Sequence, residues 1–262
     1  MDQARVAVVT GAGTGIGAAC ARALAGPCDR LVLLGRRTAP LEEVAAGITA
    51  DRPKVTVDIR SVDVSDVAAV SAFADWCRAE LPGIGVLVNN AGSPQPRITG
   101  GLDDVASAWE STWRANTLSV VLMTEALKDQ LTRAGSATSG GSASAGGRVI
   151  TIGSFAATLG TGSPAYASAK AALETYTVTL ARELGPEGIT ANVVAPGYTD
   201  GTELLAGRIT PERHERLVSA TASRRAGTPD EIASLVAYLA SPLAAYVNGQ
   251  TIIANGGTYL PG

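Results

Sequence analysis

The sequence predicts an α/β protein with a doubly wound, seven-stranded parallel sheet and helices on both faces. Two observations carry this prediction. Short apolar, β-branched runs alternate with helical patterns along the chain, and a glycine-rich loop joins the first such run to the first helical one. With 262 residues, of which 46 % are apolar, residues 1–262 can form one large domain with a buried core.

Strands are expected where apolar runs have strand length, because strands buried on both faces of a parallel sheet are hydrophobic throughout. These runs are 6–10, 31–35, 54–61, 86–89, 148–152, 190–195 and 251–254. Helices are expected at 15–25, 40–50, 64–80, 104–133, 166–184, 211–219 and 229–239. Residues 134–147 are Gly, Ser, Ala and Thr with little to bury, so this segment is expected to be a flexible surface loop.

The first expected strand leads into a loop in which every second residue is glycine, Gly11-Ala-Gly-Thr-Gly-Ile-Gly17. Glycines permit a tight turn and the close approach of a pyrophosphate, which the amide groups at a helix start can bind. Strand, glycine loop and helix in this order predict a Rossmann-type dinucleotide site. The expected contacts in this loop are Gly11, Gly13, Thr14, Gly15 and Ile16.

A second motif places Tyr166 and Lys170 four residues apart in an expected helix, so that they share one face. A free phenol has a pKa of about 10. A nearby ammonium favours phenolate and lowers the pKa toward the pH at which a general acid or base is most effective. Ser154 precedes Tyr166 by twelve residues and Asn116 precedes it by fifty. Together these groups can carry a proton-coupled hydride transfer.

The glycine spacing, Asn89-Asn90-Ala91-Gly92, Asn116, Ser154 and Tyr166-x-x-x-Lys170 together resemble the short-chain dehydrogenase/reductase family over nearly the whole chain. The resemblance implies that Tyr166 transfers the proton and that Lys170 holds the nicotinamide ribose and lowers the tyrosine pKa. It also implies that Ser154 binds the substrate oxygen. Asn116 is expected to kink its helix and to seat a water that relays protons to Lys170.

The same resemblance implies further cofactor contacts. They are Asp63, Val64, Asn90, Ala91, Gly92, Pro196, Gly197 and Thr199, with Tyr166 and Lys170. Asp63 can equally be a helix N-cap. In Pro196-Gly-Tyr-Thr-Asp-Gly-Thr202 the threonine is shifted by one position from the family pattern, which leaves open whether Thr199 or Thr202 meets the cofactor. The gap of twelve residues before Tyr166, where thirteen is common, leaves Ser163 as the competitor of Ser154.

Cofactor choice is predicted at the end of the second strand. Relatives that prefer NAD usually carry an acidic residue eighteen positions after the last glycine of the loop, where this chain has Gly35, followed by Arg36 and Arg37. Two guanidinium groups can bind a 2′-phosphate that a carboxylate would repel, although an arginine at a strand end can also be a solvated cap. The predicted cofactor is therefore NADPH/NADP+.

Composition excludes several other classes. A net charge of −3 does not indicate a nucleic-acid partner or a membrane surface. Three cysteines without metal-like spacing, and no basic-then-apolar leader, favour a cytoplasmic protein. His214 is the only histidine, which argues against a Ser-His-Asp hydrolase or a histidine-ligated zinc site. We expect no bound metal.

The most favoured function is an NADPH-dependent ketoreductase acting on a small-molecule carbonyl, either a 3-oxoacyl thioester or a related biosynthetic ketone, free or bound to a carrier protein. Residues 249–257, from Gly249-Gln-Thr to Gly256-Gly257, are similar to those of 3-oxoacyl-thioester reductases. The alternatives are an oxidative secondary-alcohol or sugar dehydrogenase and a non-catalytic nucleotide sensor, which typically lacks the tyrosine or the lysine.

Two expected helices carry apolar residues on more than one face, which predicts a partner surface. These residues are Leu118, Val121, Leu122 and Leu127 in one helix and Ala171, Leu173, Val178 and Leu180 in the other. Relatives pair these helices across a twofold axis and use the carboxy-terminal strand for a second one. A homotetramer is therefore expected, with a dimer as the alternative.

Overall fold

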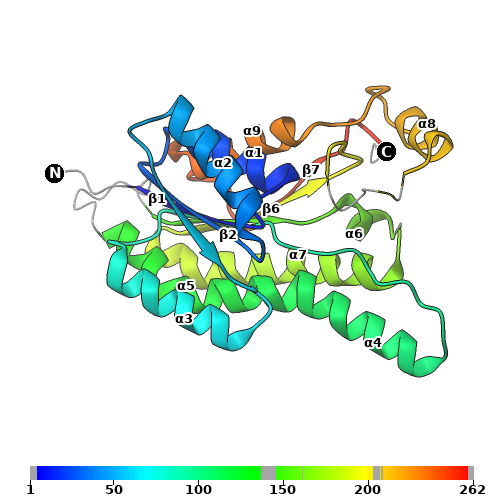
Figure 1. The fold of residues 1–262 in the computed structure, drawn as a ribbon, viewed down its shortest axis with the longest axis horizontal. Helices are drawn as coiled ribbons and strands as arrows, with labels where there is room; N and C mark the ends of the chain where they lie inside the picture. Colours follow the sequence, from blue (N-terminus) through cyan, green and yellow to red (C-terminus); the bar gives the residue numbers. More distant parts are fainter. Residues whose placement is uncertain (1–4, 137–145, 161, 203–206, 208, 259–262) are drawn as a thin grey trace.

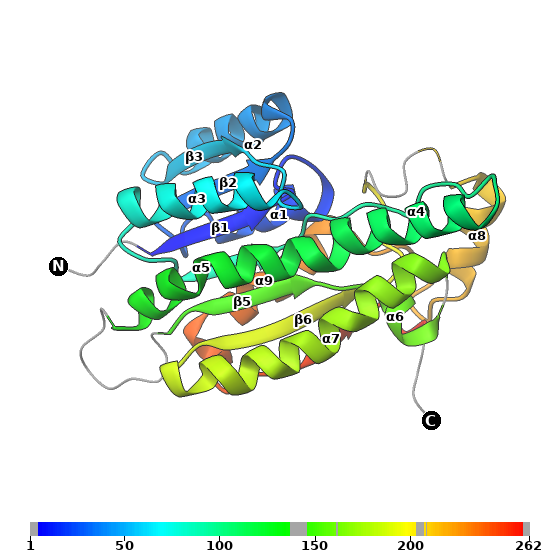
Figure 2. The same ribbon diagram turned by 90° about the horizontal axis from the view of Figure 1, so that it is seen from below.

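The structure, a computed structural model, describes residues 5–136, 146–160, 162–202, 207 and 209–258. Its centre is a seven-stranded parallel sheet with the order β3-β2-β1-β4-β5-β6-β7 (Figures 1 and 2). The strands are β1 (Val6–Thr10), β2 (Arg30–Gly35), β3 (Thr56–Ser61), β4 (Val86–Asn89), β5 (Arg148–Ile152), β6 (Thr190–Pro196) and β7 (Thr251–Ala254). The predicted fold class is confirmed.

Helices cover both faces of the sheet. On one face lie α1 (Gly15–Leu24), α2 (Thr38–Asp51) and α9 (Pro229–Ala240), and on the other lie α3 (Val67–Glu80), α5 (Ser119–Ser136) and α7 (Pro164–Leu184) (Figures 1 and 2). Along β2, Leu31 and Leu33 belong to the apolar core of the first face, whereas Val32 and Leu34 belong to that of the second. Alternate side chains of one strand thus fill two cores, which is why the strand is apolar throughout.

The expected helix 104–133 is interrupted. It forms α4 (Leu102–Trp113), a π-helical turn η1 (Arg114–Leu118) and then α5. The Asn116 side chain donates from Nδ2 to the carbonyl oxygen of Thr112 at 2.9 Å, and so occupies the acceptor that the backbone N–H four residues on would use in an α-helix. The break that was expected at Asn116 is therefore a π turn.

Helix α3 begins three residues later than predicted, and this corrects one interpretation of Asp63. Its N-cap is Asp66, whose Oδ1 accepts from the Ala69 N–H at 2.7 Å. The Asp63 carboxylate instead accepts from the backbone N–H and the hydroxyl of Ser65, at 2.9 and 2.7 Å. Asp63 shapes the turn before the helix and does not cap it.

The remaining helical segments are α6 (Phe155–Leu159), α8 (Pro211–Ser219) and the 3₁₀ turns η2 (Gly185–Glu187) and η4 (Pro242–Ala244). Helix α6 was not predicted. Its Ser154 N-cap accepts from the Ala156 N–H at 3.2 Å, and its last turn is closed by Gly160 at φ 63°. Of the predicted flexible loop 134–147, residues 137–145 lie outside the described residues. In the part of the chain that is described, no helix is both long and apolar enough to cross a membrane.

Candidate active site

A cavity of about 440 Å³ opens at the carboxyl ends of the strands. It lies where the strand order reverses between β1 and β4, the point at which open α/β sheets bind ligands. Its lining includes every predicted site residue. These are Gly11, Gly13, Thr14, Gly15, Ile16, Arg36, Arg37, Asp63, Val64, Asn90, Ala91, Gly92, Asn116, Ser154, Tyr166, Lys170, Pro196, Gly197 and Thr199.

The glycine loop leaves the amino end of α1 open to the cavity. Thr14, at the N-cap, makes no side-chain hydrogen bond to the helix, and the first turn holds no acidic residue. A β-carbon at position 17 would lie 2.1 Å from the carbonyl oxygen of Gly11, so the loop can fold against the helix only because Gly17 has none. Unfilled amide donors at a helix start form a site for an anion such as a diphosphate.

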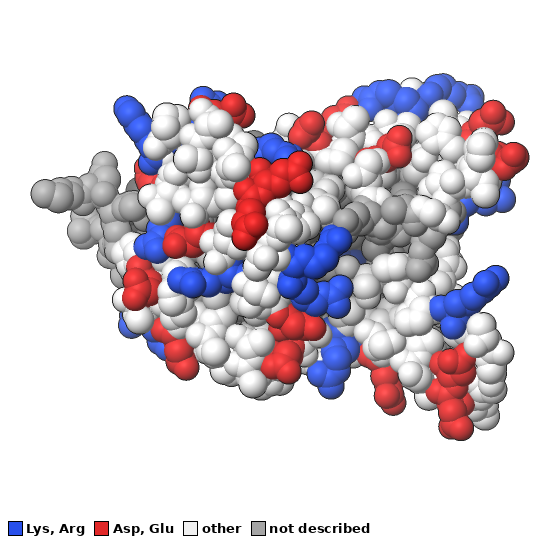
Figure 3. Space-filling model, in the orientation of Figure 1, with Lys and Arg blue, Asp and Glu red and all other residues white. Residues whose placement is uncertain are grey.

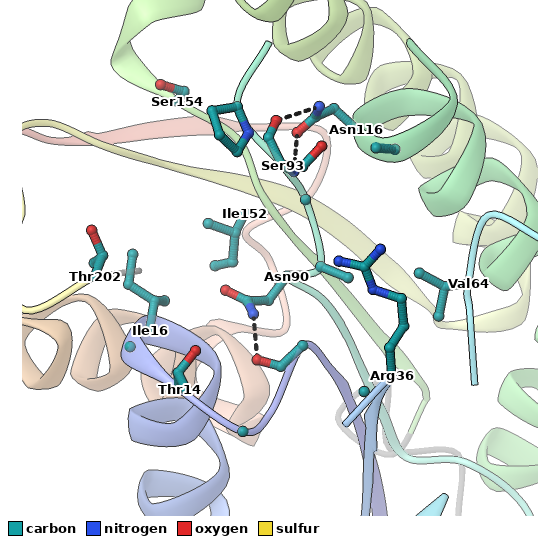
Figure 4. A pocket seen from close by; sticks show the side chains of 18 of the residues that line it. Thr14, Ile16, Arg36, Val64, Asn90, Ser93, Asn116, Ile152, Ser154 and Thr202 are labelled. Atoms are coloured by element: carbon teal, nitrogen blue, oxygen red, sulfur yellow. Dashed lines mark hydrogen bonds between the residues drawn. The ribbon is translucent and has the colours of Figure 1, made fainter. Parts of the chain in front are cut away.

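The loops after β1 and β4 are tied together behind this site. Thr10 Oγ1 accepts from the backbone N–H groups of Asn90 and Ala91, at 2.9 and 3.0 Å. The Asn90 side chain in turn donates to the carbonyl oxygens of Thr10 and Gly11, at 2.9 and 3.1 Å. Figure 4 shows one of these two bonds. These bonds hold the two loops as one wall of the cavity.

One end of the cavity is basic and exposed. Arg36 follows β2, and its side chain extends toward Val64 (Figure 4). The two hydrogen bonds from Ser65 hold the pKa of Asp63 below its usual value, with smaller contributions from Arg36 and Arg114. Because Gly35 carries no side chain and the guanidinium of Arg36 faces this end, the residues present fit a ligand with a phosphate here better than one with only hydroxyl groups.

The other end of the cavity is buried. Asn116 is fully buried, and its amide pairs with the backbone of Ser93: Oδ1 accepts from the Ser93 N–H at 3.2 Å, and Nδ2 donates to the Ser93 carbonyl at 2.8 Å (Figure 4). Lys170 is only 4 % exposed, and its Nζ donates to the Ile152 carbonyl at 2.8 Å. Burial lowers the pKa of Lys170 to about 8.

Tyr166 and Ser154 meet at this buried end despite the shortened gap between them. Both residues line the cavity, and the Ser154 hydroxyl lies close enough to the Tyr166 phenol to lower its pKa. Ser163, the competing serine, is the N-cap of α7 and does not line the cavity. Ser154 is therefore the serine that accompanies the phenol.

The expected effect of Lys170 on the tyrosine is not what the structure shows. Burial raises the pKa of Tyr166, and the hydrogen bond from Ser154 lowers it by less, so the net shift is upward. The Lys170 Nζ lies 5.9 Å from the centroid of the tyrosine ring and is itself bonded to Ile152. Desolvation is therefore the dominant effect on Tyr166, and the phenol stays protonated at neutral pH.

The two candidate threonines lie at different places. Thr199 is 4 % exposed, and its Oγ1 donates to the Gly197 carbonyl at 3.3 Å. Thr202 lies over the start of α1, with its Cα 3.5 Å from where a β-carbon of Gly15 would be. Both line the cavity, and Thr202 is the one placed beside the open amides of α1.

Sequence reasoning missed part of the lining. The additional residues are Gly35, Pro40, Leu41, Val62, Ser65, Ala115, Ile152 and Gly153. Several adjoin a motif residue, as Ala115 adjoins Asn116 and Gly153 adjoins Ser154, so adjacency could have found them. Pro40 and Leu41 reach the cavity from α2 and have no such signal.

Comparison with known proteins agrees with this geometry. A family model described as enoyl-(acyl carrier protein) reductase matches residues 11–259. The 3-oxoacyl-[acyl-carrier-protein] reductase FabG of Escherichia coli (strain K12) is 34 % identical over 261 residues, which is 98 % of each chain. The Pseudomonas aeruginosa RhlG/NADP active-site complex matches with a TM-score of 0.82 and 30 % identity, over 98 % of this chain and 96 % of that one. A short chain dehydrogenase from Burkholderia cenocepacia J2315 in complex with NADP matches with a TM-score of 0.81 and 32 % identity, over 98 % of both chains.

Proposed function

The chain belongs to the short-chain dehydrogenase/reductase family, and we propose that it is an NADPH-dependent ketoreductase whose substrate is a 3-oxoacyl thioester or a related biosynthetic ketone. The observation that carries the proposal is that Ser154 and Tyr166 line the buried end of one cavity together with Lys170. Two hydroxyl groups at one place suit an oxygen that gains negative charge during the reaction. The similarity to a 3-oxoacyl-[acyl-carrier-protein] reductase supports the substrate class.

The residues present fit NADPH along the length of the cavity. The glycine loop and the open amino end of α1 suit the diphosphate, with Thr202 beside them. Arg36 and Arg37 suit the 2′-phosphate, and Asp63 and Val64 lie where the adenine would be held. The nicotinamide half would meet Asn90, Ala91, Gly92, Lys170, Pro196, Gly197 and Thr199. Bound NADPH supplies the hydride.

The chain's own residues transfer the proton. In reduction, the carbonyl carbon takes the hydride, and the Tyr166 phenol gives its proton to the carbonyl oxygen, which yields a secondary alcohol and a phenolate. Ser154 hydrogen-bonds the same oxygen while its charge grows. The Lys170 ammonium stabilises the phenolate, which regains its proton from solvent.

An acid must hold its proton at working pH. Burial raises the pKa of Tyr166, so the phenol holds the proton that it would give to the carbonyl oxygen in reduction.

We propose that the functional assembly is a homotetramer. Leu127, Leu173 and Leu180, which are among the apolar residues noted on the two helices, are at most 1 % exposed and belong to the subunit's own core. The exposed apolar groups include Trp109 and Trp113 of α4 and Val178 of α7 on one side, and Tyr238, Leu243, Tyr246 and Ile253 around α9 and β7 on another. Two separate apolar surfaces suit two twofold axes. Sedimentation at micromolar concentration should not return a 26.5 kDa monomer, and such a result would contradict the tetramer.

The surface and the cysteines support a small-molecule substrate in a reducing compartment. Basic and acidic side chains are mixed over the face seen in Figure 3. Cys20, Cys28 and Cys77 are free and buried, as expected in the cytoplasm.

A substrate panel tests the proposed reaction. Purified protein with NADPH should consume it, as followed by nicotinamide absorbance, when a 3-oxoacyl thioester is added. The reverse reaction is measured with secondary alcohols and sugars in the presence of NADP+. Faster turnover in that direction at neutral pH, or no turnover with any carbonyl, would overturn the assignment as a ketoreductase.

A further inference from the structure

Helix α7, which carries Tyr166 and Lys170, begins without a cap from its own N-cap residue. Ser163 makes no side-chain hydrogen bond to the helix, and Pro164 at the first position has no N–H to offer. The next amide belongs to Ala165, which is 2 % exposed. A buried N–H without a partner is costly, so this one needs an acceptor from elsewhere in the chain.

That acceptor is Gln95, seventy residues earlier in the chain. Its side-chain oxygen Oε1 accepts from the Ala165 N–H at 3.2 Å. A glutamine in the loop after β4 thus takes the role that an N-cap side chain usually has. The amide that it holds is immediately before Tyr166.

The loop segment that carries Gln95 is itself fixed at the buried end of the cavity. Ser93, two residues before Gln95, exchanges both of its backbone hydrogen bonds with the Asn116 side chain (Figure 4). Pro94 between them restricts the backbone. Residues 93–95, which we name the 93–95 strap, therefore join the π turn at Asn116 to the start of α7.

We propose that Gln95 is a positioning residue for Tyr166, which acts through the first turn of α7 and does not touch the reacting atoms. The helix that carries the phenol is held one turn later by the bond from Lys170 to Ile152. Gln95 supplies a second anchor, at the backbone. This inference rests on the proposed role of Tyr166 in proton transfer.

Gln95→Ala removes the acceptor and frees the start of α7. We expect kcat for carbonyl reduction to fall about tenfold, since a small misplacement of a reacting group is enough to cost that much. The KM for NADPH should stay unchanged, because Gln95 does not line the cavity. A Gln95→Ala variant with wild-type kcat would overturn the proposal.

Gln95→Glu is the conservative variant. A carboxylate oxygen can still accept from the Ala165 N–H and is favoured at the amino end of a helix, so kcat should recover most of the loss. Its negative charge disfavours phenolate and should move the high-pH limb of the kcat profile to higher pH.

Asn248→Ala is the matched control. Asn248 is also a distant amide bound to α7, but at the other end: its Nδ2 donates to the Ala181 carbonyl at 3.3 Å, and its Oδ1 accepts from the Ala191 N–H at 2.8 Å. Its loss should lower the Tm while leaving kcat and the pH profile as in the wild type. An equal fall of kcat in Asn248→Ala and Gln95→Ala would reduce Gln95 to a general stabiliser of the helix and overturn the proposal.

A titration without substrate separates this proposal from the proposed function. Phenolate absorbance is measured against pH for each protein and for the same protein with Tyr166→Phe added. The difference between the two curves reports the pKa of Tyr166 alone. A changed pKa in Gln95→Ala, which introduces no charge, supports the positioning role even if the wild type reduces no carbonyl, in which case only the proposed function fails. An unchanged pKa and unchanged kcat in both Gln95 variants, with an active wild type, would overturn the positioning role alone.

Discussion

The two ends of the cavity hold their functional groups in different ways. At the buried end, Asn116 is fully buried and Lys170 is 4 % exposed, and both are bonded to backbone carbonyl groups, of Ser93 after β4 and of Ile152 at the end of β5. At the other end, Arg36 and Asp63 are exposed to solvent. The function of the buried end therefore depends on geometry and desolvation, whereas the function of the exposed end depends on net charge.

This difference decides how much a substitution should matter at each end. A group in a low-dielectric site interacts strongly with charge that develops beside it, and a proton donor there has no substitute. An exposed charge is screened by water and salt, and its loss weakens binding without removing the chemistry. The largest effects are therefore expected at the buried end.

Tyr166→Phe tests the buried end most severely. The ring remains and the proton is lost, so kcat should fall by roughly 10²–10⁴ while NADPH still binds. Steady-state kinetics and a NADPH titration give both quantities. Tyr176→Phe is the control, because this second tyrosine of α7 bonds Glu125 at the surface and lies outside the cavity. Near-wild-type turnover in Tyr166→Phe would remove Tyr166 from the mechanism.

Arg36→Leu tests the exposed end. A guanidinium–phosphate contact of about 1.5–3 kcal/mol corresponds to roughly tenfold to a hundredfold in kcat/KM with NADPH. The value with NADH should barely change, because NADH lacks the 2′-phosphate. Arg52→Leu, which removes an exposed arginine outside the cavity, should alter neither value. Equal losses with both cofactors would show that Arg36 does not select between them.

The pH dependence of NADPH binding tests the role of Lys170 at the buried end of the cavity. Burial lowers its pKa from 10.5 to about 8, so the ammonium is present below pH 8 and is lost above it. Binding that uses the charged form should weaken above pH 8 by up to about tenfold per pH unit. Calorimetric titration from pH 6 to 9.5 measures this. In Lys170→Met the affinity should be low and independent of pH in this range, and a wild-type affinity that stays flat would contradict the role of the ammonium.

The smallest effects are expected for the two aspartates before α3. Asp66→Ala removes the N-cap bond to Ala69 and should cost about 0.5–2 kcal/mol of unfolding free energy, with the KM for NADPH unchanged. Asp63→Ala should show the reverse pattern, a higher KM with little loss of stability, because Asp63 lines the cavity and caps no helix. Denaturant unfolding and steady-state kinetics of both variants distinguish the structural role of Asp66 from the binding role of Asp63. A larger stability loss at Asp63 would show that its turn is the structural one.

Local sequence signals predicted the fold and most of the cavity lining because they are periodic or contiguous. Apolar runs marked the strands, and β1, β4, β5 and β7 have the predicted bounds. The glycine loop and the Tyr166–Lys170 spacing marked the elements that meet at the switch point between β1 and β4. A parallel sheet brings the carboxyl ends of its strands together, so motifs at those ends converge once the topology is known.

The remaining features depend on contacts between distant residues. Asp63 and Asp66 are the same residue type three positions apart, and only the turn made by Ser65 decides which of them caps α3. Thr202 reaches Gly15 across the cavity, and Gln95 reaches Ala165 across seventy positions. The pKa of Tyr166 depends on its burial, which the spacing to Lys170 does not reveal.

The central claim is that the buried end of the cavity carries out turnover and the exposed end selects the cofactor. The preference of the wild-type protein for NADPH or NADH tests both parts of this claim most directly. Reduction of one 3-oxoacyl thioester is followed with each cofactor, and kcat/KM for the cofactor is compared. The account predicts reduction with both and a preference for NADPH of at least about tenfold, as expected for one guanidinium–phosphate contact. Equal values, a preference for NADH, or no reduction with either cofactor would contradict it.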